Sequence, residues 1–212
     1  MIKRVLKIVI GIQLIYLLLV NGVLQLQLTQ DLVNKIRPEK FYVTWEHAWS
    51  WYPFRVHAEG IFANGQARTQ QWEVTATSAS GSISVLPLIL KHVYLSDIQA
   101  ENIDYRQRPR LKPDIDYSNR LAYFPEIQGR EIVPVDTDEL KKKRPWKIHM
   151  NGLQAQGDHR FWVYNMQGTA SGSAAGNLYT ETRRGAFWLD VEQFELDLGP
   201  AFLNGNAEAF HG

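Results

Sequence analysis

The sequence predicts a mainly β protein, in which an N-terminal transmembrane helix precedes an antiparallel β-sheet that a long proline-rich loop interrupts. Three observations support this fold class. The chain begins with a long apolar stretch, hydrophobic residues then recur at every second position, and five prolines break that alternation between residues 106 and 145. At 212 residues the chain is long enough for one domain with a core of its own.

The apolar stretch lies between Lys7 and Asp31, where 23 consecutive residues carry no charge. As a helix rising about 1.5 Å per residue it would cover roughly 34 Å, enough to cross the hydrocarbon core of a bilayer. A cleaved signal peptide and a buried helix of a soluble domain are the alternatives, but no small-x-small cleavage site follows. We therefore expect residues 1–40 to form an uncleaved anchor helix and its extension, with these residues in the membrane: Ile8, Leu14, Leu18 and Leu24.

The charges that flank the stretch predict its orientation. Lys3, Arg4 and Lys7 precede it, whereas glutamines and Asp31 follow it. The positive-inside rule then places the N-terminus in the cytoplasm and the rest of the chain outside the cytoplasm. Helical spacing of apolar residues continues beyond the stretch as far as Pro38, so the helix is expected to run on out of the membrane.

From residue 41 onward, alternation of apolar and polar residues predicts antiparallel strands with one wet face. Turns are expected at residues 51–53, at Asn64-Gly65 and at Ser80-Gly81. The alternation changes phase between residues 95 and 105, which indicates bulges. It disappears over residues 106–145, which we interpret as a long loop with one short helix near residues 119–124. The last residues alternate again and stop, so residues 41–212 are expected to begin a longer protein.

Composition and motif spacing argue against several classes of function. Lys and Arg number 23 against 22 Asp and Glu, so the chain lacks the strongly basic field of a nucleic-acid-binding protein. It has no cysteine, and its six histidines show no metal-ligand spacing. The glycine-rich stretch 168–176 lacks the Lys-Ser/Thr ending of a phosphate-binding loop. We expect no enzymatic activity, no cofactor, no metal and no nucleic-acid partner.

Two further clusters leave alternatives open. Seven aromatic residues lie between positions 41 and 54, where they suit either a bilayer interface or the packing of the first strands. The basic run 141–144 suits a solvated loop, a contact with anionic lipid head groups or a contact with a partner.

Two segments carry a resemblance to a known family. Residues 49–57 read WSWYPFRVH, and residues 86–105 form an apolar stretch followed by two short strands that end in the step Asn102-Ile103-Asp104-Tyr105. Together with the basic N-terminus and the apolar helix, they resemble the amino-terminal region of AsmA-like proteins. The resemblance implies an anchor in the inner membrane of a diderm bacterium and a curved periplasmic sheet. That sheet would form a hydrophobic groove similar to that of chorein-type bridge lipid transfer proteins.

The resemblance implies a contribution to phospholipid transport or outer-membrane lipid homeostasis, with acyl chains of membrane lipids in the groove. The residues expected to line the groove are Val56, Ala58, Phe62, Trp72, Val74, Ile83, Val85, Val93 and Leu95. The alternative is an anchored β-scaffold that binds envelope proteins during outer-membrane assembly and carries no lipid. An anchored enzyme has the least support, because no nucleophile with its base and no metal cluster is visible.

Overall fold

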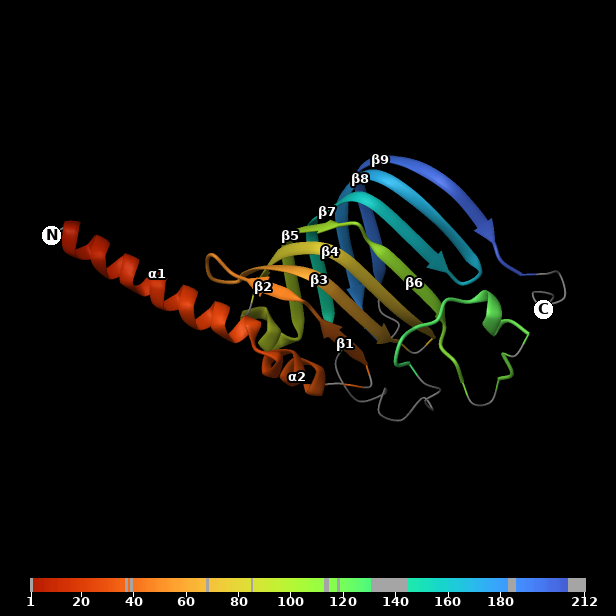
Figure 1. Ribbon diagram of the computed structural model, residues 1–212, viewed down its shortest axis with the longest axis horizontal. Helices are drawn as coiled ribbons and strands as arrows, with labels where there is room; N and C mark the ends of the chain where they lie inside the picture. The colour runs from red at the N-terminus through yellow and green to blue at the C-terminus, as the bar shows by residue number, and fades with distance from the viewer. Residues whose placement is uncertain are drawn as a thin grey trace.

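The computed structural model of the chain describes residues 2–36, 38, 40–67, 69–84, 86–112, 115–117, 119–130, 145–182 and 186–205 (Figure 1). Helix α1 (Ile2–Gln25) leads through a break at Leu26 into helix α2 (Gln27–Ile36). The chain then enters one nine-stranded sheet. Strand makes up 56% of the chain and helix 22%, so the predicted class is confirmed.

The sheet has the order β1-β3-β4-β5-β7-β8-β9, with β2 paired to β3 and β6 paired to both β4 and β7. Figure 1 shows the long strands arching over their length. The strands and the short 3₁₀ helices η1 and η2 have these bounds: β1 (Phe41–Thr44), β2 (His47–Trp49), β3 (Arg55–Gln66), β4 (Gln70–Ser84), η1 (Leu86–Leu90), β5 (His92–Glu101), β6 (Asp104–Pro109), η2 (Leu121–Tyr123), β7 (Lys147–Val163), β8 (Met166–Glu181) and β9 (Phe187–Leu203).

The sheet is mixed, where the sequence predicted an antiparallel one. β5 and β6 both pair with β7 in parallel, and every other pairing is antiparallel. A parallel pair needs a crossover connection that returns the chain to the same end of the sheet. The connection between Pro109 and Lys147 has this role. The predicted loop therefore begins after Pro109 and not at residue 106, because β6 occupies its first four residues.

Helices α1 and α2 cover the outer edge of the sheet with side-chain amides. We call Asn21, Gln25, Gln30 and Asn34 the amide stripe. Gln25 Nε2 donates to the carbonyl of Ala48, and Gln30 Nε2 donates to that of Trp45, both at 2.8 Å.

Two members of the stripe each make a pair of bonds to one strand residue. Asn34 Nδ2 donates to the carbonyl of Val43 while Asn34 Oδ1 accepts from its N–H, both at 2.8 Å. Asn21 bonds the carbonyl and N–H of Ser50 in the same way, at 3.1 and 2.7 Å. The stripe thus occupies backbone groups that an edge strand would otherwise leave open to another chain.

The predicted turn at residues 51–53 is confirmed, since β2 ends at Trp49 and β3 begins at Arg55. The other two predicted turns are wrong. Asn64-Gly65 lies inside β3, where a Cβ on Gly65 would overlap the indole of Trp72 on the neighbouring strand. Ser80-Gly81 lies inside β4, next to a shift in its register with β5. Limited space therefore explains Gly65, whereas a Cβ on Gly81 would meet only ordinary contacts.

The phase changes predicted between residues 95 and 105 have a backbone cause. Asp97 and Asn102 adopt left-handed conformations with φ of 50° and 51°. The first accompanies the register shift between β4 and β5, and the second separates β5 from β6. Asn and Asp tolerate this region better than other residues with a Cβ, so the predicted bulges are confirmed.

The described part of segment 110–130 covers one face of the sheet near the end of β3, the start of β4 and the end of β6. Arg130 Nε donates to Asn64 Oδ1 at 2.8 Å, and the N–H of Gln128 donates to Glu73 Oε2 at 2.9 Å. Arg108 Nε donates to Gln71 Oε1 at 2.9 Å beneath the segment. Burial lowers the pKa of Arg108 and of Arg130. The predicted short helix is confirmed as η2.

Replacing Asn34 by leucine should destabilise the edge of the sheet. The substitution removes both hydrogen bonds to Val43 and leaves two backbone groups beside an apolar side chain, at a cost of about 1 to 3 kcal/mol. Denaturant unfolding of the full chain measures the loss, and hydrogen exchange at the Val43 amide localises it. Gln27→Leu on the exposed side of α2 is the control and should change neither. Equal effects of the two variants would contradict the role of the stripe.

Candidate functional site

An apolar row crosses five strands on one face of the sheet. The registers pair Ile83 with Leu95, Leu95 with Met150, Met150 with Leu178 and Leu178 with Leu189. Because cross-strand partners share a face, these five side chains lie side by side. We call them the apolar row. Val93 and Ile148 form a pair in the adjacent row on the same face, which continues through Thr180 to Phe187.

No second layer of described structure buries this face. None of the five side chains of the apolar row is buried, and Leu189 is 55% exposed. Among the described residues, the buried hydrophobic side chains are Ala48, Leu111, Phe124, Ile127 and Ala170. The accessible surface is 14,496 Å², whereas a compact monomer of this mass would expose about 10,000 Å². The apolar row is therefore open to a ligand, a lipid or another chain.

The opposite face of the same strands carries an aromatic ladder. Tyr94 and His149 stack with ring centroids 4.1 Å apart, His149 and Tyr179 lie 4.7 Å apart, and Tyr179 and Trp188 lie 5.5 Å apart. These four residues are cross-strand partners one position away from the apolar row, so they point to the other side of the sheet. The two faces of these strands therefore differ chemically, one aliphatic and the other aromatic and polar.

Charges around the ladder shift the pKa values of its members. Desolvation, together with the neighbouring charges of His92 and Lys147, lowers the pKa of His149, so its neutral form is favoured. A hydrogen bond to the Glu181 carboxylate raises the pKa of Tyr179 to about 12. The same hydrogen bond lowers the pKa of Glu181, which also forms an ion pair with Lys147 at 3.5 Å. We interpret the Tyr179–Glu181 hydrogen bond and the Glu181–Lys147 ion pair as interactions that hold the stacked rings in place, and not as an acid-base pair.

The structure places the predicted groove residues in two parts of the sheet. Ile83 and Leu95 belong to the apolar row, Val93 lies in the adjacent row, and Val56 and Ala58 pair with Gly81 and Ala79. Val85 lies outside the described residues.

Trp72 and Val74 lie nearer the far end of β4. Val74 pairs with Ala63 and Tyr105 there, and Tyr105 pairs with Phe161. Phe62 pairs with Thr75, one position along from Val74, so Phe62 lies on the face opposite Val74. The register thus does not bring all of the predicted residues onto one face.

The predicted anchor residues lie on α1. Ile8, Leu14 and Leu18 are 62%, 55% and 76% exposed, as a lipid-facing helix requires. Leu24 is half-buried at the junction with the sheet, where its carbonyl accepts a hydrogen bond from Trp45 Nε1 at 3.1 Å. The segment Lys3–Gln25 is long and apolar enough to cross a membrane.

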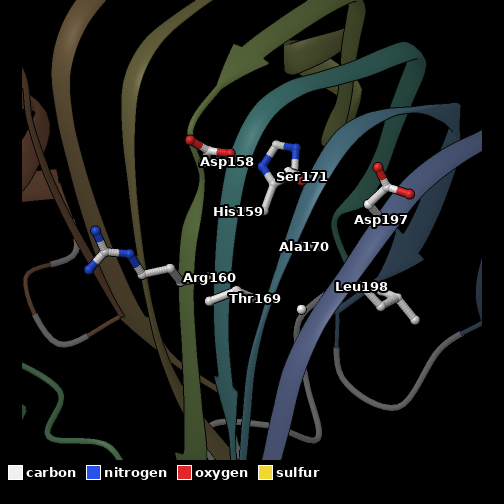
Figure 2. Close-up of a pocket in the computed structure, with 9 residues that line it drawn as sticks. Asp158, His159, Arg160, Thr169, Ala170, Ser171, Asp197 and Leu198 are labelled. Carbon is white, nitrogen blue, oxygen red and sulfur yellow. The ribbon is translucent and has the colours of Figure 1, made fainter.

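A hollow on β7, β8 and β9 is lined by charged, polar and small residues together with Leu198, and Figure 2 labels Arg160 and Asp197 among them. His159 Nδ1 accepts a hydrogen bond from the N–H of Ile103 at 3.3 Å. This bond fixes the imidazole ring but does not supply the hollow with a nucleophile. Within the described part of the chain, no group of three His, Asp or Glu side chains is placed to hold a metal ion. The hollow offers no recognisable catalytic constellation.

No protein-family model, curated protein or solved structure matches this chain. Sequence reasoning missed Met150, Leu178 and Leu189 as partners of Ile83 and Leu95. Their alternation with polar neighbours was visible, but the strand order that joins them was not. Sequence reasoning also missed the amide stripe. The Asn and Gln residues of the stripe are spaced by four or five positions, and this spacing could have indicated that they share one side of the helices.

Replacing His149 by phenylalanine should make stability less sensitive to acid. Because the folded state lowers the pKa of His149, its contribution is complete above the ordinary value of 6.5 and is lost as the pH falls through the folded value. Phenylalanine preserves stacking without titrating. Unfolding midpoints measured across this pH range should fall less steeply for His149→Phe than for the parent. The control His47→Phe, at an exposed position, should keep the parental slope. Parallel curves for all three proteins would contradict this assignment.

Proposed function

We propose that the chain is a single-pass protein of a bacterial inner membrane, with its N-terminus in the cytoplasm and its sheet in the periplasm. The sheet receives acyl chains of membrane lipids on the apolar row and contributes to phospholipid transport or outer-membrane lipid homeostasis. Membership of the AsmA-like family is part of this proposal, and its support is the resemblance of residues 49–57 and 86–105.

One observation carries the proposal: the chain combines an apolar row that no described structure covers with a helix of membrane-spanning length. Aliphatic side chains left in water favour any apolar partner, at about 25 cal/mol per Å² of surface removed from water. Acyl chains suit the row because they need no hydrogen-bond partner, and no polar side chain interrupts the row. The anchor would hold the sheet where such lipids are abundant.

The alternative, a scaffold for envelope proteins, is favoured by one feature of the fold. β9 is seventeen residues long and pairs with β8 on one side, and no described strand pairs with its other side. An unpaired edge of this length is a template for adding a strand from another chain. Such a partner would extend the sheet through backbone hydrogen bonds and would leave the apolar row unfilled.

A carboxylate in the apolar row should abolish lipid binding without unfolding the protein. Leu95→Asp places a charge among aliphatic side chains where acyl chains would lie, but the position is part-exposed, so the carboxylate stays hydrated when lipid is absent. Mass spectrometry of lipids extracted from the purified protein should show a large loss of bound phospholipid. Ser96→Asp, the next residue and on the other face of β5, is the matched control and should retain lipid.

A photo-crosslinking residue at Met150 separates the two functions. Phospholipid adducts support the lipid function, whereas protein adducts with no phospholipid would overturn it and support the scaffold. Unfolding of Leu95→Asp, seen as loss of cooperative melting, would also count against the lipid function, because it would mean that the row is a closed core.

The orientation is tested by a reporter that is active only in the cytoplasm, fused after Gly212. Because Lys3, Arg4 and Lys7 precede the apolar stretch, the fusion should be inactive in cells. The same reporter fused before Met1 is the control and should be active. Strong activity of the C-terminal fusion would overturn the proposed topology.

A further inference from the structure

Six apolar side chains gather where β3 begins and β4 ends, beside the middle of α1. They are Trp51, Tyr52, Phe54, Leu86, Ile89 and Leu90, which we call the rim. All are more than half exposed, and Leu86, Ile89 and Leu90 reach 81%, 81% and 74%. The N–H of Ile83 donates to the carbonyl of Phe54 at 2.9 Å, which holds the turn after β2 against the strand that leads into η1.

Hydrogen bonds fix the position of the rim along α1. Gln13 Nε2 donates to the carbonyl of Trp51 at 2.6 Å, and the hydroxyls of Tyr16 and Ser50 bond at 2.7 Å. Among the described residues, Gln13 is the first of α1 that forms a hydrogen bond with the domain, so residues 2–12 extend beyond it. The uncharged part of this extension is residues 8–12, and at about 1.5 Å per residue it covers about 7.5 Å, roughly a quarter of a hydrocarbon core about 30 Å thick.

We infer that the rim enters the hydrocarbon of the bilayer alongside α1. If α1 spans, residues after Gln13 must occupy the remaining hydrocarbon, and the rim lies beside those residues. The same geometry explains how polar groups are tolerated within the span. Gln13, Tyr16 and Asn21 bond to residues 50 and 51, which removes the cost of leaving them unpaired in lipid.

The charges at the rim match a lipid head-group layer. Arg55 immediately follows Phe54, and Lys91 immediately follows Leu90, so each apolar turn ends on a basic residue. Long basic side chains next to buried apolar ones place their charge at the phosphate level of a bilayer. The 3₁₀ helix η1 of the rim joins β4 to β5, the two strands that carry Ile83 and Leu95 of the apolar row. This inference rests on the proposed membrane anchor and adds a second point of insertion to it.

Depth-dependent quenching tests the inference on the full chain. The protein has no cysteine, so each single-cysteine variant carries one fluorescent nitrobenzoxadiazole label. The rim positions are Phe54→Cys and Leu90→Cys, the anchor reference is Leu14→Cys, and the control is Leu203→Cys. Leu203 is 76% exposed and apolar like the rim, but it lies at the opposite end of the strands. The variants are reconstituted in phosphatidylcholine and phosphatidylglycerol vesicles containing doxyl-labelled lipid.

Labels at Phe54, Leu90 and Leu14 should lose most of their emission to the doxyl lipid, whereas the label at Leu203 should lose little. If the label at position 14 is quenched while the labels at positions 54 and 90 stay as bright as the label at position 203, rim insertion is overturned. The proposed anchor would still stand in that case. Absence of quenching at Leu14 as well would overturn the anchor, and the rim inference with it. Circular dichroism of each labelled variant verifies that the sheet is retained.

Discussion

The amide stripe is the contact on which the rest of the arrangement depends. A sheet edge must satisfy its backbone groups, and here Asn21, Gln25, Gln30 and Asn34 satisfy them with side chains instead of another strand. The stripe also holds the two helices against the β-domain through hydrogen bonds from side chains to the backbone. This contact determines the position and the orientation of the sheet relative to α1. It therefore also keeps the first strands close to any membrane that the helix enters.

Local signals in the sequence predicted the helix, its extension to Ile36, the strand alternation and the bulges near Asp97 and Asn102. They did not predict the parallel pairing of β7, because crossover topology depends on contacts between residues far apart in the chain. Asn64-Gly65 resembles a turn, but the close approach of Trp72 accounts for that glycine. The site was predicted in part, since alternation identifies Ile83 and Leu95, whereas only the strand order adds Met150, Leu178 and Leu189. The register of β3 with β4 is unbroken, so Phe62 shares a face with Val56 and Ala58, whereas Trp72 and Val74 lie on the other face. Alternation within each strand could not relate the face of one strand to that of the next, because that relation depends on the register.

Polarity is distributed unevenly along the arched strands. Where segment 110–130 covers the sheet, the buried side chains of the strands are polar, namely Asn64, Gln71, Glu73 and Arg108, and they are linked by hydrogen bonds among themselves and to the segment. The buried apolar side chains there, Leu111, Phe124 and Ile127, belong to the segment. Where nothing described covers the sheet, this face is aliphatic. Buried polar groups of this kind depend on complete hydrogen bonding, which makes segment 110–130 a specific and not an interchangeable cover.

The parallel pairing of β5 with β7 constrains the order in which the chain assembles. β3 and β4, and likewise β7 and β8, are neighbours joined by connections of two or three residues, so each pair forms through local contacts. β7 reaches β5 only after 37 residues, from Arg110 to Trp146, are closed into a loop. That closure costs about 3 kcal/mol in chain entropy beyond a constant term. The two groups of strands would thus fold separately, and their docking along β7 would be the late, slow event that sets the overall folding rate.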